Sequence, residues 1–358
     1  MTRNFITIQK QRAKIIDAIR LFFKHKGFLE VFTPTFVKLP GMEPYLNPLP
    51  YTFQDEKNKS YKGYVITSPE YSLKKLLSRG FPNIYQMATV FRQGESFGPM
   101  HNPEFTMLEW YRPHSDYTQI MKDVEQLTCA AALAVHKTLL IPFGNTIINL
   151  KQPWQKISVK QAFQKYAHVN LDNARTVSSF RKQLGHKPYP IPKNANWDDL
   201  FYTVFLNDIE QNFPKNKPII VYDYPLPQAA LAKRKPCSRI TAAHGANKSR
   251  NSLQGKLPSF YAERFEAYIG GVEIGNAFSE LTDWKEQYTR LKHEQALRRK
   301  LGKDAYAIDM DFIAGLKSGI PETGGIAVGV ERLQMVLLNI QDINDLMTFP
   351  VNTLFKSE

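Results

Sequence analysis

The hydrophobic positions at the start of the chain recur at the spacing of an amphipathic helix, which we expect over residues 8–26. Its apolar residues fall on one face, and Gly27 follows the last turn. They are Ile8, Ile15, Ile16, Ile19, Phe22 and Phe23. A strand is expected over 28–32, just before a Thr-Pro pair. By themselves these elements form an ordinary helix–strand unit.

A second helix start follows a short strand expected over 64–67. Ser68 is a preferred N-cap residue and Pro69 is favoured at the first helical position, so we expect a helix over about 70–79. Glu70 then lies in the first turn of a helix just past a strand, where sites collect on sheet folds. An acid there would also be explained by the helix dipole alone.

Two further strands, expected over 83–92 and 104–111, are joined by the loop 93–103. Period-two alternation places four residues of the second strand on one face. They are Phe105, Met107, Glu109 and Tyr111. An acid and a phenol beside two apolar side chains favour the wall of a pocket over a plain core face.

The pattern as a whole predicts one α+β domain over residues 1–358, with antiparallel strand pairs and helices outside them. No Rossmann or P-loop glycine pattern is present. The other expected elements are a loop with weak strands over 40–63, a helix over 116–136, a helical insertion over about 151–218, a strand over 219–224, a basic loop over 232–257, a polar helix that Asp283 caps and that ends near Gly302, and an apolar helix over 331–339.

The pair Gly270-Gly271 is a turn signal between two strand-like runs and predicts a hairpin. If these two residues form the loop, Glu266 and Glu273 project to the same face of adjacent strands. Two carboxylates at such a short distance repel one another unless a cation lies between them, and Mg²⁺ bound to a nucleoside triphosphate is the obvious candidate. The alternative is a solvated hairpin edge whose acids, Glu280 included, are unrelated.

Composition narrows the class of protein. The chain has 358 residues, 43% hydrophobic content and two cysteines without disulfide or metal spacing, which indicates a soluble protein of a reducing, cytoplasmic setting. It has no signal-peptide core and no apolar stretch near 20 residues, so we expect no membrane association. The formal net charge of +14 favours polyanionic partners such as nucleotides, RNA or an acidic protein.

Two long segments carry a family resemblance. Val90–Tyr111 contains Arg92, a loop and then His-Asn-Pro-Glu-Phe; residues 324–333 read Gly-Gly-Ile-Ala-Val-Gly-Val-Glu-Arg-Leu. With the hairpin, they resemble motifs 2 and 3 of class II aminoacyl-tRNA synthetases of the lysyl type. The first helix and strand resemble motif 1, the dimer interface of that family. The resemblance implies an antiparallel sheet flanked by helices, and a homodimer.

The resemblance also implies roles at an ATP site. Arg92 would hold the α-phosphate and the substrate carboxylate, and with Arg332 it would be catalytic. In this sequence the spacing after Arg92 is one residue longer than in the synthetases, and Glu95 is the candidate for reading adenine. The remaining implied ATP and Mg²⁺ contacts are His101 and Asn102 to the phosphates and adenine edge, Phe105 and Arg332 on the two faces of adenine, Ile274 and Gly329 beside the nucleotide, and Glu266 and Glu273 as metal ligands.

The amino-acid pocket follows from the same resemblance. Several acids there suit a substrate with two ammonium groups. Ala327 stands where lysyl-tRNA synthetases have Gly, and one methyl in a pocket shifts preference by ~1–3 kcal/mol, here toward (R)-β-lysine over lysine. The implied pocket residues are Ser68, Glu70, Glu109, Tyr111, Asn276, Phe278, Glu280 and Ala327.

The acceptor is suggested by what precedes the catalytic motifs. Motif 1 begins at the start of the chain, so we expect no anticodon-binding domain. A stand-alone core of this kind is similar to the elongation factor P–lysine ligases, which implies transfer to a lysine of elongation factor P, with tRNA an unlikely main substrate. The alternatives are a truncated lysyl-tRNA synthetase paralogue that acylates tRNA or makes dinucleotide polyphosphates, and an inactive regulatory paralogue.

Overall fold

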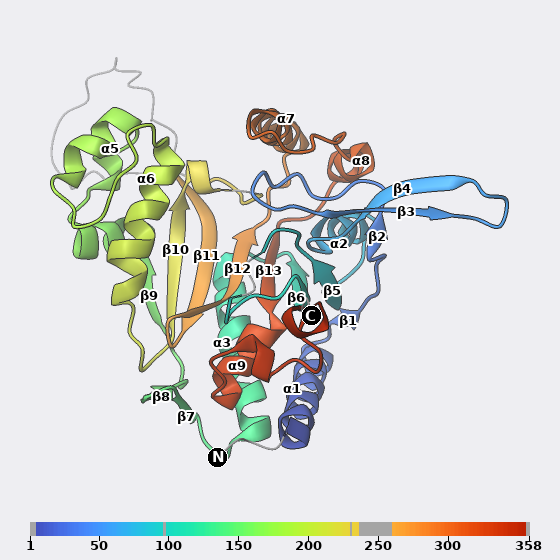
Figure 1. Cartoon of the computed structure of the whole chain (residues 1–358), viewed down its shortest axis with the longest axis horizontal. Helices are drawn as coiled ribbons and strands as arrows, with labels where there is room; N and C mark the ends of the chain where they lie inside the picture. The colour runs from blue at the N-terminus through green and yellow to red at the C-terminus, as the bar shows by residue number, and fades with distance from the viewer. Residues whose placement is uncertain (1–4, 96–97, 230, 236–259, 356–358) are drawn as a thin grey trace, which may run out of the picture.

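A computed structural model describes residues 5–95, 98–229, 231–235 and 260–355 of the chain (Figure 1). The basic loop expected over 232–257 lies outside the described residues from 236 onward. None of the helices in the described part is long and apolar enough to cross a membrane.

An eight-stranded sheet in the order β1-β5-β6-β13-β12-β11-β10-β9 forms the centre of the fold. Only the two outermost pairs, β1 with β5 and β10 with β9, are parallel. The five pairs between them are antiparallel, which confirms the predicted α+β class. The strands are β1 Leu29–Glu30, β5 Ile84–Phe91, β6 Glu104–Pro113, β9 Gln155–Ser158, β10 Ile219–Pro225, β11 Tyr261–Ile269, β12 Val272–Ser279 and β13 Thr323–Gly329.

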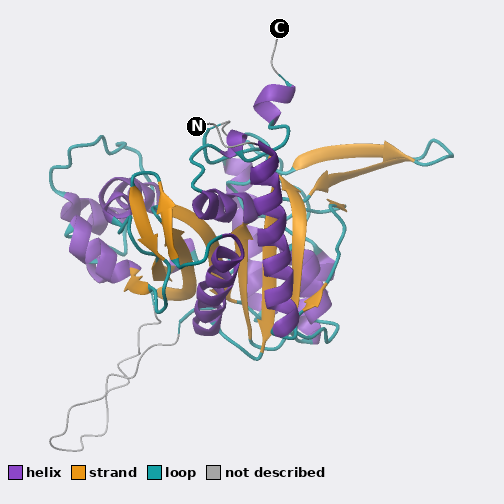
Figure 2. Cartoon of the chain, turned by 90° about the horizontal axis from the view of Figure 1, so that it is seen from below, coloured by secondary structure: helices purple, strands orange, loops and turns teal. Residues whose placement is uncertain are grey.

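Three helices form a layer against this sheet: α1 (Phe5–His25), α3 (Tyr117–Val135) and α9 (Val330–Leu338) (Figure 2). The apolar face of α1 predicted from the sequence is buried at Ile8, Ile15, Ile19, Phe22 and Phe23. The strand predicted over 28–32 is shorter than expected. Two residues pair with β5, and a Thr-Pro pair soon follows, where proline has no amide to donate to a ladder.

The segment 151–218 has its own apolar core beside β10. Stacked aromatic rings dominate this core, with Phe163 and Phe201 centroids 4.9 Å apart. The segment also contributes the edge strand β9, which its sequence pattern did not predict because four residues give too short a pattern. Its helices are α4 Val159–Ala162, α5 Val177–Leu184 and α6 Trp197–Val204, with π-helical turns at Phe163–Ala167 and Phe205–Ile209.

A second group of helices packs together: α2 (Glu70–Leu77), α7 (Trp284–Lys300) and α8 (Met310–Ser318). The Tyr71 and Phe312 rings stack with centroids 4.4 Å apart and join α2 to α8. The N-cap of α2 is Pro69, one residue later than predicted, although the Glu70 amide still donates to Ser68 Oγ at 3.0 Å. Helix α8 was not predicted.

The segment 40–63, expected to be a loop with weak strands, contains one strand of six residues and most of a second. There β3 (Leu49–Gln54) and β4 (Ser60–Val65) form a hairpin that projects from the body of the protein (Figure 1). Aromatic rings on its surface support it: Phe53 and Tyr61 stack with centroids 5.1 Å apart. Smaller elements complete the fold: β2 Phe36–Val37, which pairs with β4, the hairpin of β7 Leu140–Phe143 and β8 Thr146–Asn149, and α10 Val351–Leu354.

Candidate active site

A cavity of about 310 Å³ lies over the central strands β6, β12 and β13. Strand alternation aims every second side chain of these strands into it, and the first turns of α2 and α9 supply its two ends. Of all the site residues predicted from the sequence, Glu266 is the one that does not line this cavity. The cavity gathers Ser68, Glu70, Arg92, Glu95, His101, Asn102, Phe105, Glu109, Tyr111, Glu273, Ile274, Asn276, Phe278, Glu280, Ala327, Gly329 and Arg332.

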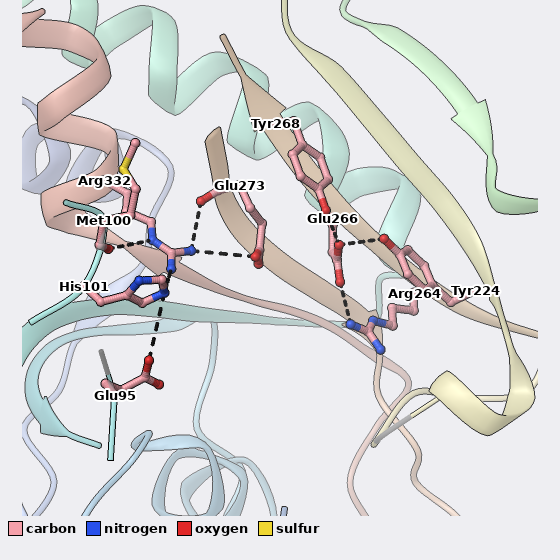
Figure 3. Close-up of polar contacts among 9 residues, drawn as sticks. All are labelled: Glu95, Met100, His101, Tyr224, Arg264, Glu266, Tyr268, Glu273 and Arg332. Carbon is pink, nitrogen blue, oxygen red and sulfur yellow. Dashed lines mark hydrogen bonds and ion pairs between the residues drawn. The ribbon is translucent and has the colours of Figure 1, made fainter. Parts of the chain in front are cut away.

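At one end, Arg332 in the first turn of α9 fixes the loop between β5 and β6 (Figure 3). Its Nη2 donates to His101 Nε2 at 2.8 Å, and its Nε donates to the Met100 carbonyl at 3.4 Å. Its Nη1 donates to the Glu273 carbonyl at 3.2 Å. Burial and the Arg332 charge lower the pKa of His101, so the imidazole is neutral at pH 7 and Nε2 accepts.

Arg92, just after β5, lies with its guanidinium 5.1 Å from the centroid of the Phe105 ring. Burial lowers its pKa, and its Nε is buried without a hydrogen-bond partner within the described ranges. A buried cation with an unused donor is suited to an anion. Glu95 lies at the same end, with Oε2 3.9 Å from His101 Nε2.

Asn102 has a structural role that the sequence did not indicate. Its Nδ2 donates to the Glu104 carbonyl at 2.6 Å, and its Oδ1 accepts from the Val351 amide at 3.1 Å. The side chain is buried and holds the start of β6 against α10. Both of its polar groups are therefore engaged with backbone.

The predicted hairpin is present, with Gly270 and Gly271 at φ +62° and +85° between the paired residues Ile269 and Val272. A bulge follows on β11, so Glu266 lies opposite Asn276.

The Glu266 carboxylate is already engaged (Figure 3). Its Oε2 accepts from the hydroxyls of Tyr224 and Tyr268, both at 2.6 Å, and Oε1 accepts from Arg264 Nη2 at 2.6 Å. Burial and the charge of Glu266 raise the pKa of Glu273 to about 7. Of these two acids, Glu273 lines the cavity, and Glu266 acts on it only through its charge.

The opposite end of the cavity is acidic. Glu109 Oε1 accepts from Ser68 Oγ at 2.5 Å and its Oε2 accepts from the Tyr111 hydroxyl at 3.0 Å. Burial raises the pKa of Glu109 to about 8 and that of Glu280 to about 7, and the charge of Glu70 adds to both shifts. Carboxyl groups with such raised pKa values are stabilised in their ionised form by a cation beside them.

Three charged residues of this end were missed by the sequence reasoning. Lys74 Nζ lies 2.5 Å from both Glu70 and Glu280, and the i, i+4 spacing of Glu70 and Lys74 was a readable signal. Glu43, in the loop before β3, and Glu294, on α7, line the cavity, and Lys74 lies behind its wall against Glu70 and Glu280. Burial raises their pKa values to about 7 and about 8. No local pattern marks either residue.

Both ends of the cavity lie on the antiparallel sheet that the resemblance to class II synthetases implied. Comparison with known proteins agrees with that resemblance. The family model of tRNA synthetases class II (D, K and N) matches residues 1–353, and the chain belongs to this family of ATP-dependent ligases. Its relatives include proteins named elongation factor P–(R)-beta-lysine ligase. That of Histophilus somni (strain 2336) is 35% identical over 345 residues, which span 95% of this chain and 94% of its own. That of Haemophilus ducreyi is 36% identical over 346 residues (95% and 93%), and that of Yersinia pestis (strain Pestoides F) is 34% identical over 346 residues (96% and 94%).

Proposed function

We propose that this chain activates (R)-β-lysine, or lysine, with ATP and transfers the acyl group to a lysine side chain of elongation factor P. The observation that carries the proposal is the polarity of one cavity, with Arg92 and Arg332 at one end and Glu70, Glu109 and Glu280 at the other. A diamino acid would place its ammonium groups among the acids and its carboxylate toward Arg92. The names of the relatives support (R)-β-lysine as the substrate and elongation factor P as the acceptor.

The proposed reaction has two steps. In the first, a carboxylate oxygen of the substrate attacks the α-phosphorus of ATP, and pyrophosphate leaves. Arg92 stabilises the negative charge that builds on the phosphate, while Arg332, held by neutral His101, contacts the other phosphates. In the second, the acceptor amine attacks the carbonyl carbon of the aminoacyl-adenylate, loses a proton, and AMP leaves. The substrate carboxylate is the nucleophile, so no covalent enzyme intermediate is needed.

Mg²⁺ fits this site through Glu273. Magnesium in nucleotide sites is commonly held by one or two carboxylates and the phosphates themselves. Within the described ranges no group of three or more His, Cys, Asp or Glu side chains is placed to hold a metal. When bound, Mg²⁺ would neutralise charge on the phosphates. Glu266 would contribute its charge, since two tyrosine hydroxyls occupy Oε2 and Arg264 Nη2 pairs with Oε1.

We propose further that the protein works in the cytoplasm as a homodimer, as one catalytic domain for which tRNA is not the main substrate. The dimer is supported by large apolar side chains that remain exposed around α1 and β1: Leu21, Leu29 and Phe32 are 53%, 47% and 81% exposed. A second copy that covers them would bury apolar surface. Light scattering of the purified protein, with Phe32→Glu as the variant, tests this part of the proposal.

The central experiment is ATP–pyrophosphate exchange with lysine, (R)-β-lysine and norleucine, followed by mass analysis of elongation factor P and of tRNA incubated with the enzyme. We expect exchange with the two diamino acids, none with norleucine, and a mass gain on the protein. Acylated tRNA with unmodified elongation factor P would contradict the acceptor and point to a lysyl-tRNA synthetase paralogue. Absence of exchange with every amino acid would contradict the enzymatic proposal and point to a regulatory protein.

A further inference from the structure

A buried lysine stands between two acids of the amino-acid end of the cavity. The side chain of Lys74 is 2% exposed, and its Nζ lies 2.5 Å from Glu70 Oε1 and 2.5 Å from Glu280 Oε2. Glu70 and Lys74 are one turn apart on α2, so the helix fixes their relation, while Glu280 follows the end of β12. The ammonium group thus joins two elements far apart in sequence at the wall of the cavity.

The formal charges of this end match a particular kind of ligand. When ionised, the carboxylates of Glu43, Glu70, Glu109, Glu280 and Glu294 outnumber the single ammonium group of Lys74, so this end carries a net negative charge. A diamino acid carries two ammonium groups, and its carboxylate would lie toward Arg92. A buried charge is stable only when it is paired, so the excess of acids favours a substrate that brings ammonium groups to this end.

We propose that Lys74 is a positioning residue for the amino-acid substrate, which pairs with Glu70 and Glu280, holds both carboxylates in place and so adjusts the cavity to a ligand with two ammonium groups. The inference rests on the proposed function and deepens it. Lys74 acts through the two carboxylates, since their oxygens occupy its ammonium group.

The electrostatics of the cluster support this role. Burial by itself lowers the pKa of Lys74, but the charges of Glu280 and Glu70 outweigh burial and shift the pKa upward, so the side chain stays an ammonium at neutral pH. Its charge in turn opposes the effect of burial on the pKa of Glu280. The other charged or titratable groups that face this cluster are Glu43 from the loop before β3, Arg92 from the end of β5, Glu109 and Tyr111 from β6, and Glu294 from α7.

Removal of Lys74 has a specific consequence. Without the cation, Glu70 and Glu280 repel one another, and the pKa of Glu280 rises further above its ordinary range. Glu280 then holds a proton at neutral pH, and an incoming ammonium group has to displace it. The amino-acid substrate binds more weakly, and the pH above which it binds well moves upward. An ion pair that only stabilised the fold would change the melting temperature and leave the pH dependence of binding as it was.

The test is ATP–pyrophosphate exchange between pH 6 and 9, with KM measured separately for the amino acid and for ATP. The variants are Lys74→Met and Lys74→Arg. The matched control is Lys75→Met, because Lys75 is the next residue of the same helix and pairs with Asp309, which does not line the cavity. Thermal melts of all variants report on folding.

For Lys74→Met we expect the KM of the amino acid to rise roughly 30-fold or more at pH 7. The KM of ATP should change less than about 2-fold, because the ATP site lies at the other end of the cavity and distant sites affect one another little. The pH below which the amino-acid KM increases should move upward by about one unit or more, because one unit is the scale of shift that a lost opposite charge produces. Lys74→Arg keeps the charge and should retain the wild-type pH profile even if its KM rises.

Three results would overturn the inference. The first is a Lys74→Met variant with the KM and pH profile of Lys75→Met. The second is a Lys74→Arg profile displaced upward from that of the wild type by about one unit or more; this comparison still decides the matter if Lys74→Met does not fold. The third is equal loss of affinity for ATP and the amino acid. A wild-type enzyme without exchange would instead contradict the proposed function itself.

Discussion

Arg332 Nη2 donates a hydrogen bond to His101 Nε2 at 2.8 Å and so joins residues 231 positions apart at the nucleotide end of the cavity. A guanidinium has no acceptor, so His101 must be the acceptor and cannot be protonated on Nε2. The contact holds a neutral imidazole and an oriented cation side by side, facing the place proposed for the phosphates.

The first prediction concerns the pKa of His101. Burial lowers it, and the neighbouring Arg332 charge lowers it further. Arg332→Met removes that charge, so the pKa of His101 should rise toward its ordinary value of 6.5. Titration of the imidazole ring protons by NMR measures the shift, with His101→Gln to assign the signal. An unchanged or lower pKa in Arg332→Met would contradict the role given to this contact.

The second prediction concerns Arg92. Arg92→Ala should reduce ATP–pyrophosphate exchange by ~100- to 1000-fold or more, the scale of losing one group that stabilises transition-state charge. Stability should change little, because the described residues include no hydrogen-bond partner for its Nε. Exchange assays and thermal melts together check both statements. Retained exchange in a folded Arg92→Ala protein would remove the assignment of the phosphate site.

The third prediction concerns the methyl group of Ala327. Ala327 lies in register with Glu109 on β6 and with Asn276 on β12, so its side chain sits between two predicted substrate contacts. Ala327→Gly should change the ratio of kcat/KM for (R)-β-lysine to that for lysine by ~10- to 200-fold, in favour of lysine. Exchange with each amino acid in turn measures the ratio, and the KM of ATP is the internal control. A ratio equal to that of the wild type would show that this methyl does not select the substrate.

The fourth prediction concerns stability and pH. Burial raises the pKa values of Glu280 and Glu109 to about 7 and about 8, against an ordinary carboxyl value of 4.5. Between these values the native state binds more protons than the unfolded state, so the contribution of these groups to the free energy of unfolding falls as pH rises from about 5 to 8. A substrate ammonium favours the ionised carboxylates, so it should stabilise the protein more at pH 8 than at pH 6. Urea unfolding at both pH values, with and without lysine, measures this. Equal stabilisation by lysine at the two pH values would contradict it.

Much of the site was predictable because its residues belong to long local patterns. The alternation of β6 placed Glu109 and Tyr111 on one face, and the two-glycine turn fixed the hairpin that carries Glu273. These features depend on backbone periodicity and on φ > 0 at glycine, which a sequence shows directly. The same reasoning gave only weak strands within a loop for β3 and β4, because the proline content of 40–63 outweighed the alternating aromatic residues.

What the sequence by itself determined was the strand and helix pattern, the α+β class and most of the residues that line the cavity, because each depends on interactions within a few residues. Only the tertiary structure decided how those residues are engaged. It placed Glu266 against two tyrosines and Arg264, tied Asn102 to backbone, and brought Lys74 between Glu70 and Glu280. The physical reason is that the partner of a buried charge is chosen by the packing of separate elements, and that packing sets pKa values and ligand charge through distances that no local pattern contains.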